Sequence, residues 1–335
     1  MSAAVATAPA PATDTGAWSL LTDDALVVHS APGTRDLVAR WLPTSAAPWT
    51  ERGDAHSRRA RIVVSTGTVE LAAPDERRTL EFSRFEAWVR ADDVLVRSEN
   101  GSGAVVDATR HEARVHVAPG VFSRRVDDTH YLLTLVSGLL LGRLHRPLAH
   151  AAGVVAPDGG GWLLVGDARA GKSTTCVNLA RAGWSFLSDD HVVLARGKRA
   201  WVEGWPRAVH LDLGWADGRS TGERGSAPAH ALAGVTRTRR APIAGLLFPR
   251  VVADEPTSVA RVSASTAFTR LLRQSPWLMA DVACAVPLAA LLADVASLPA
   301  YEVRLGHDCY RDARPLLAAL ADAGAPGIQS SPAAH

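Results

Sequence analysis

The octapeptide from Gly166 to Ser173 constrains this chain more than any other segment. Its letters, GDARAGKS, match the G-x-x-x-x-G-K-S pattern of a phosphate-binding loop. An apolar run, 162–165, precedes the loop, and a run typical of a helix, 174–180, follows it. The pattern therefore predicts an α/β sheet in which a strand delivers the loop, a helix leaves it, and nucleotide phosphates bind between the two.

Each conserved type of residue in such a loop has a physical task. Gly166 and Gly171 let the backbone close around an anion, so that successive N–H groups face the phosphates. Lys172 is expected to reach the β- and γ-phosphates of ATP, and the Ser173 hydroxyl to bind Mg²⁺. The residues expected to contact the nucleotide are Gly166, Asp167, Ala168, Arg169, Ala170, Gly171, Lys172, Ser173 and Thr174.

Two adjacent carboxylates, Asp189 and Asp190, follow the short apolar run 184–188. Neighbouring residues of a strand point to opposite faces, so one carboxylate can face the metal and the other an incoming hydroxyl. Phosphoryl transfer requires little more than such positioning and charge. The alternative is an ordinary Asp-Asp turn at a strand end.

The composition limits the function classes. The chain has 335 residues, 47% hydrophobic residues and a formal net charge of +2, and its basic residues are scattered, so nucleic acid is not an expected partner.

Residues 1–16 lack the charge and apolar core of a signal peptide and are expected to form a disordered tail, as are residues 326–335. The longest apolar stretch, 131–141, is shorter than the roughly 20 residues of a membrane span. With three cysteines at unrelated spacings, the chain is expected to be cytoplasmic, without a membrane partner.

The chain divides into two parts by pattern. Residues 17–126 are rich in short β-branched runs with one helical interruption, 34–42, and predict a mainly β accessory domain, which is expected to recognise the protein or peptide substrate. A buried helix at 127–146 then leads to a strand, 150–156, a glycine-rich turn and the strand 162–165, which together predict a β-hairpin feeding the loop.

Four features in order resemble the HPr kinase/phosphorylase superfamily of bacterial serine kinases. They are the strand His150-Ala151-Ala152-Gly153-Val154, the loop 166–173, the pair Asp189-Asp190, and the segment 298–303 before a terminal helix. The resemblance covers about residues 130–325 and assigns 127–325 to a kinase domain. It implies an α/β P-loop core related to phosphoenolpyruvate carboxykinase, and transfer of the ATP γ-phosphate to a serine hydroxyl.

The resemblance also implies roles for single residues. Asp189 is similar to the base that activates the acceptor and Asp190 to the second metal carboxylate, although the two could be exchanged. His150 matches a histidine near the transferred phosphoryl group, or is a histidine packed on the following turn. Arg207 and Arg250 are candidates to stabilise the transition state, or are surface arginines.

The HPr-specific signature after the Asp pair is missing, and only 202–205 stands near its place. A serine of another protein or of a biosynthetic peptide is therefore the expected acceptor, and a homo-oligomer is compatible with the pattern. The segment 216–225 could close over this acceptor or be a simple connection. Two alternatives remain open: a small-molecule hydroxyl kinase of the shikimate or gluconate type, and a nucleotide-binding regulatory protein without transfer activity.

Overall fold

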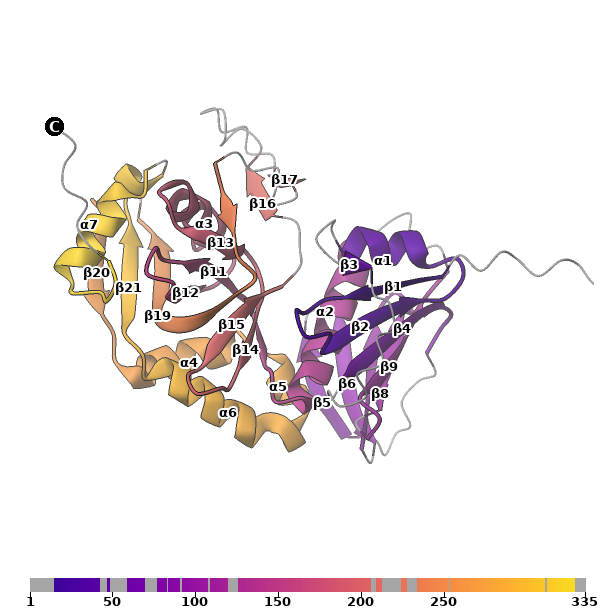
Figure 1. Cartoon of the computed structure of the whole chain (residues 1–335). Coiled ribbons are helices and arrows are strands. Elements are labelled where there is room, and N and C mark those ends of the chain that lie inside the picture. Colours follow the sequence, from indigo (N-terminus) through magenta and orange to yellow (C-terminus); the bar gives the residue numbers. More distant parts are fainter. Residues whose placement is uncertain are drawn as a thin grey trace, which may run out of the picture.

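The computed structural model has a mixed α/β fold built around two large sheets (Figure 1). It describes residues 15–42, 47–48, 59–69, 77–82, 84–90, 92–107, 109–119, 126–205, 209–212, 224–227, 234–252, 254–310 and 312–328. Arg207, residues 216–223 and most of the two expected tails lie outside the described residues.

The first sheet contains nine strands in the order β3-β1-β2-β4-β9-β8-β7-β6-β5. The strands are β1 Gly16–Ser19, β2 Leu26–Ser30, β3 Ala47–Pro48, β4 Ala60–Thr66, β5 Arg77–Phe82, β6 Phe85–Arg90, β7 Asp93–Ser98, β8 Gly103–Asp107 and β9 Glu112–Val117, with helix α1 Arg35–Trp41 between β2 and β3. Strands β5 to β9 form an antiparallel meander, whereas β4 is parallel to both β2 and β9.

The second sheet contains ten strands, eight of them in the order β10-β14-β15-β19-β12-β11-β13-β18. They are β10 Leu148–Ala149, β11 Ala151–Val155, β12 Gly161–Val165, β13 Ser185–Ser188, β14 Val192–Ala195, β15 Trp201–Gly204, β18 Thr236–Arg237 and β19 Arg240–Val251, joined by β20 Ser258–Arg261 and β21 Ala300–Leu305. The long strand β19 pairs with β12, β15 and β21, and so holds the sheet together. A separate hairpin joins β16 Val209–Asp212 to β17 Arg224–Ala227.

Helices cover both faces of this second sheet (Figure 1). The helices of this part of the chain are α3 Lys172–Arg181, α4 Ala264–Arg273, α6 Val282–Ala296 and α7 Arg314–Asp322, with a 3-10 turn at His307–Cys309, while α2 Val126–Arg143 and α5 Trp277–Ala280 also contact the first sheet. Alternate side chains of β12 enter different cores. Trp162 and Leu164 pack with α3 and α7, while Leu163 and Val165 join the core that contains α4 and α6. Among the described residues, no helix combines the length and the apolar character needed to cross a bilayer.

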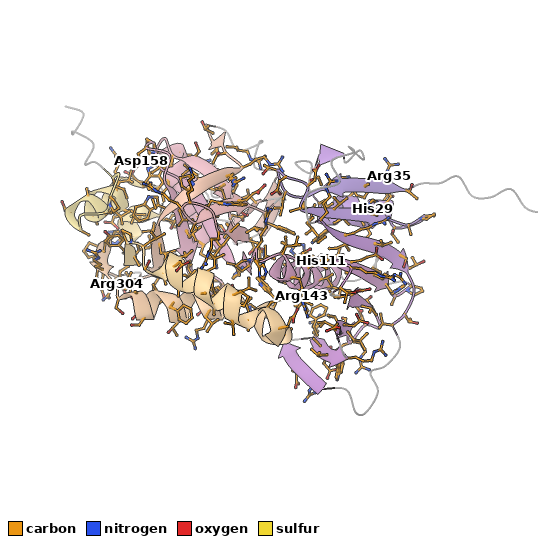
Figure 2. All side chains as sticks on the ribbon, turned by 60° about the horizontal axis from the view of Figure 1, so that its bottom comes forward. His29, Arg35, His111, Arg143, Asp158 and Arg304 are labelled. Atoms are coloured by element: carbon orange, nitrogen blue, oxygen red, sulfur yellow. The ribbon has the colours of Figure 1, made fainter. Side chains whose placement is uncertain are left out.

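Helix α2 packs against the first sheet, through β4, β7, β8 and β9, and also against α5, α6 and β10. At its C-terminal end, the Arg143 guanidinium binds Asp281, whose side chain is 7% exposed, and Figure 2 shows Arg143 at this junction. One hydrophobic core therefore continues from the first sheet into the second.

The turn between β1 and β2 makes two polar contacts with the second part. The Thr22 N–H donates to Glu203 Oε1 on β15 at 2.6 Å, and Asp23 forms an ion pair with Arg146 at 2.6 Å. Burial raises the pKa of the fully buried Glu203 carboxyl, although the hydrogen bonds from Thr22 oppose this shift. Oε2 of Glu203 has no hydrogen-bond partner among the described atoms.

This raised pKa predicts a pH-dependent stability. Above the ordinary value of 4.5, the unfolded chain releases a proton that the folded chain retains, so the free energy of unfolding falls as pH rises through this window. We expect Glu203→Gln to remove this fall. At pH 7 the free energy of unfolding of this variant should exceed that of wild type by about 1 kcal/mol. Urea unfolding from pH 4 to 8 measures the free energy of unfolding of both proteins. Glu99→Gln, which replaces an exposed glutamate, is the control. A parallel pH profile for wild type and Glu203→Gln would contradict the assignment.

Most strands and helices expected from the sequence are present. The hairpin of β11 and β12 is confirmed, as are the helix that follows the loop and the strand before the Asp pair. The apolar pattern of residues 287–292 predicts a helix that begins at Pro287, but α6 begins earlier, at Val282, and carries Pro287 inside it. The parallel pairs of the first sheet were not anticipated.

Candidate functional site

The topology of the second sheet collects the predicted residues at one edge. Strand β11 lies between β12 and β13 and is antiparallel to both. The carboxyl ends of β12 and β13 therefore meet the amino end of β11. As a result, the glycine loop after β12, the Asp pair after β13 and His150 before β11 share one edge.

The backbone of the loop 166–171 leads directly into helix α3. Gly171 has φ +98°, a backbone conformation that side chains with a Cβ atom rarely adopt, so glycine is strongly favoured there. Arg169 also has a positive φ, +66°. Helix α3 begins directly after Gly171 without a side-chain cap and without an acidic residue in its first turn. Its first N–H groups and the positive end of its dipole are thus left for an anion.

Lys172 lies at the mouth of this loop and is buried, with 6% exposure. Its Nζ donates to the carbonyl oxygens of Gly166 at 2.6 Å and Asp167 at 2.9 Å. Burial lowers the pKa of Lys172, while the charges of Asp190, Asp167 and Asp189 oppose the shift. A bound polyphosphate would add negative charge and favour the protonated lysine further.

His150 connects Lys172 to the Asp pair. Lys172 Nζ lies 3.2 Å from His150 Nε2, and His150 Nδ1 lies 3.2 Å from Asp190 Oδ1. An ammonium can only donate, so Nε2 accepts and the ring proton is on Nδ1, facing the carboxylate. The two ring nitrogens of His150 therefore bridge the lysine and the carboxylate.

Asp190 also meets His191, a residue that sequence reasoning missed. His191 Nδ1 lies 2.8 Å from Asp190 Oδ2, and the rings of His150 and His191 are 5.1 Å apart. The two histidines come together because Ala149 of β10 pairs with Val192 of β14. Position next to the Asp pair was the only sequence signal for His191.

The two carboxylates differ in exposure. Asp189 is buried, with 2% exposure, whereas the Asp190 side chain is 19% exposed. The charge of Asp189 acts on both Lys172 and the buried thiol of Cys176, so this carboxylate lies toward α3.

His150, Asp190 and His191 offer ligand atoms within 4.8 Å of one another, which is a spacing that a metal ion could use. A cation on His150 Nδ1 would move the ring proton to Nε2, where it would face the Lys172 ammonium. The contacts therefore favour a chain of polar contacts from Lys172 through His150 to Asp190 over a metal bound by this trio.

Gln274, which follows α4, is a second residue that sequence reasoning missed. Its side-chain Nε2 donates to Asp167 Oδ1 at 3.0 Å, and its backbone carbonyl oxygen accepts the backbone N–H of His150 at 2.8 Å. This buried glutamine thus links the glycine loop to the histidine. A glutamine more than 100 residues from the loop carries no sequence signal of this role.

Of the remaining candidates, Ser173 and Thr174 lie half-buried in the first turn of α3, and Asp167, Ala168 and Arg169 are exposed. Arg250 is exposed near the end of β19.

No protein-family model and no curated protein sequence matches this chain. Among solved structures, the chain is similar to the Hpr(Ser) kinase/phosphatase from Coxiella burnetii, with 14% sequence identity and a TM-score of 0.31. The match covers 52% of this chain and 94% of that chain. The likeness is weak, so the roles proposed below rest on the chain's own residues.

Proposed function

We propose that the chain is an ATP-dependent kinase that transfers the γ-phosphate to a serine hydroxyl of a protein or peptide. One observation carries the proposal: a lysine inside an uncapped glycine loop contacts a histidine that contacts a carboxylate, all at one sheet edge. A structural turn has no need of a buried lysine linked through a histidine to a carboxylate.

In this proposal, the loop N–H groups bind the phosphates, and Lys172 stabilises the negative charge that develops between the β- and γ-phosphates during transfer. Donation to His150, Gly166 and Asp167 keeps the ammonium in place before ATP binds. Ser173 and Asp190, with oxygen donors of the kind that Mg²⁺ prefers, would hold the metal. Bound Mg²⁺ would neutralise charge on the β- and γ-phosphates.

Asp189 is proposed as the group that accepts the proton of the acceptor hydroxyl, with His150 fixing the charge and orientation of Asp190 beside it. Because Asp189 is buried, it would meet the acceptor only after the acceptor displaces the groups that cover it. Arg207 and Arg250 stay predictions as partners of the transferred phosphate.

The experiment is incubation with γ-labelled ATP and Mg²⁺ together with the products of neighbouring genes, followed by mapping of the label. Label on a serine of a peptide or protein is the expected result. A labelled metabolite would instead assign small-molecule kinase activity, and ATP binding without any acceptor would assign a regulatory role.

Gln274 provides a test of the loop's organisation. Loss of its hydrogen bond in Gln274→Ala should weaken ATP binding about 2- to 10-fold, as expected for one such bond. Gln274→Glu should weaken binding more, because its carboxylate would face Asp167. Calorimetric titration measures both, with Gln329→Ala, the other glutamine of the chain, as control. Unchanged affinity in Gln274→Glu would remove the positioning role.

A further inference from the structure

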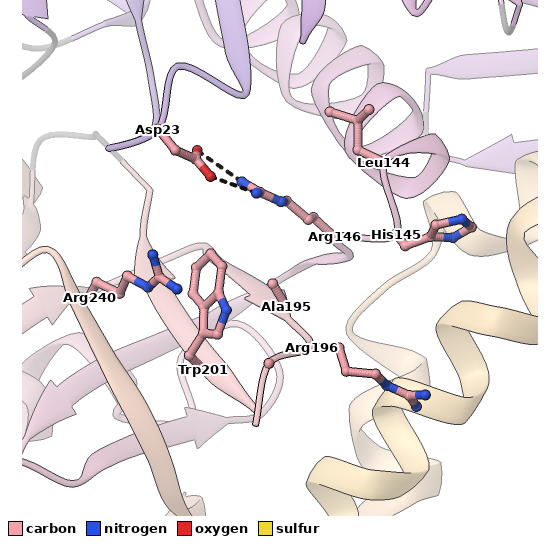
Figure 3. A pocket seen from close by; sticks show the side chains of 9 residues that line it. Asp23, Leu144, His145, Arg146, Ala195, Arg196, Trp201 and Arg240 are labelled. Atoms are coloured by element: carbon pink, nitrogen blue, oxygen red, sulfur yellow. Dashed lines mark hydrogen bonds and ion pairs between the residues drawn. The ribbon is translucent and has the colours of Figure 1, made fainter. Parts of the chain in front are cut away.

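An open pocket of about 390 Å³ lies away from the glycine loop, where the first sheet's β1–β2 turn meets the second sheet (Figure 3). The charged and aromatic side chains that line it are Asp23, His145, Arg146, Arg196, Trp201 and Arg240. Arg146 precedes β10 and Ala195 ends β14, whereas His150 follows β10 and His191 precedes β14. The pocket and the candidate kinase site are therefore at opposite ends of this strand pair.

Two guanidinium groups are arranged around one indole ring. The Arg240 Cζ lies 3.6 Å from the centroid of the Trp201 ring, and the Arg146 Cζ lies 5.5 Å from it. Trp201 is 9% exposed, so it is a fixed support rather than a free stacking surface. A guanidinium stacked in this way keeps its in-plane N–H groups free to bind an oxyanion at two points.

The positive charge of the pocket is incompletely balanced. Asp23 pairs with Arg146, and although burial alone would raise the pKa of Asp23, the hydrogen bond and charge of Arg146 hold it below its ordinary value. Arg196 pairs with Asp294, but both side chains are about 60% exposed, so this pair is weak. Among the described side chains, no carboxylate pairs with Arg240.

We propose that this pocket binds a small ligand through a phosphate or carboxylate group, with Arg240 as the two-point donor and Arg146 as the second cation. The volume falls at the low end of the range for small-molecule sites, which favours a small ligand over a macromolecule. Asp23 competes with the ligand for Arg146, so binding and the contact between the two sheets are coupled. This site is independent of the kinase activity proposed above.

Calorimetric titration of the full chain with inorganic phosphate and with citrate tests the proposal. Lys172→Ala serves as the background, because loss of this lysine is expected to weaken any phosphate binding at the glycine loop. We expect saturable binding of at least one anion, weakened at least about tenfold by the further change Arg240→Ala. Arg261→Ala, which removes an exposed arginine on β20, is the charge-matched control and should bind as the background does.

Phosphate binding alone would assign a phosphorylated ligand, and citrate binding alone a polycarboxylate. Absence of saturable binding of either anion overturns the proposal, and so does equal binding by the Arg240→Ala and Arg261→Ala variants. Asp23→Asn gives an independent measurement, since removal of the competing carboxylate should tighten binding several-fold. Weaker or unchanged binding in Asp23→Asn would contradict the part assigned to Arg146.

Discussion

Replacement of Lys172 by alanine should reduce phosphoryl transfer by about 10²- to 10³-fold, the usual cost of losing one donor to a developing charge. The lysine is the only residue that contacts both the loop carbonyls and His150 among the described hydrogen bonds. Its loss also leaves His150 Nε2 without this donor. Transfer to the cognate acceptor under saturating ATP measures the effect.

The chain offers a matched control for this change, because it contains one other lysine, Lys198, which is exposed in the turn between β14 and β15. Lys198→Ala should retain wild-type transfer, and both variants should unfold at nearly the wild-type temperature. Full activity of a folded Lys172→Ala protein would show that the loop is not a catalytic nucleotide site.

Substitution of the two aspartates should separate nucleotide binding from transfer. Asp190→Asn is expected to weaken binding of ATP in the presence of Mg²⁺, because it removes the charge of the proposed metal ligand and of the partner of His150. Asp189→Asn is expected to bind ATP normally and to lose about 10²-fold or more in transfer. Both changes conserve side-chain volume, so packing is little affected.

Calorimetric titration with ATP, with and without Mg²⁺, measures the first effect, and label transfer measures the second. If the order is reversed, so that Asp189→Asn weakens binding and Asp190→Asn abolishes only transfer, the two roles are exchanged. Equal loss of binding in both variants would contradict any division of roles.

Local patterns were sufficient for the elements that surround the loop. Alternation and glycine-rich turns predicted the β11–β12 hairpin, and the order of apolar runs predicted that α3 and β13 return the Asp pair to the same edge. These features depend on residues close in sequence, whose preferences are decided by backbone sterics and by a period of two or 3.6 residues. Pro287, by contrast, led to a wrong prediction of where α6 begins, because proline is more common at the start of a helix than inside it. Its exposed ring is tolerated there because Cys284, Leu288 and Leu291 bury one face of the helix.

The contacts that shape the two sites join residues far apart in the chain. Gln274 reaches Asp167, Glu203 accepts the Thr22 N–H, and Arg146 meets Asp23, across separations of 107, 181 and 123 residues. No local preference encodes such pairs, because each exists only after strand order and helix packing have placed its members side by side. The glycine loop could therefore be found by reading the chain, whereas the histidine contacts around Asp190 and the arginine pocket at Trp201 depended on the packing of the sheets.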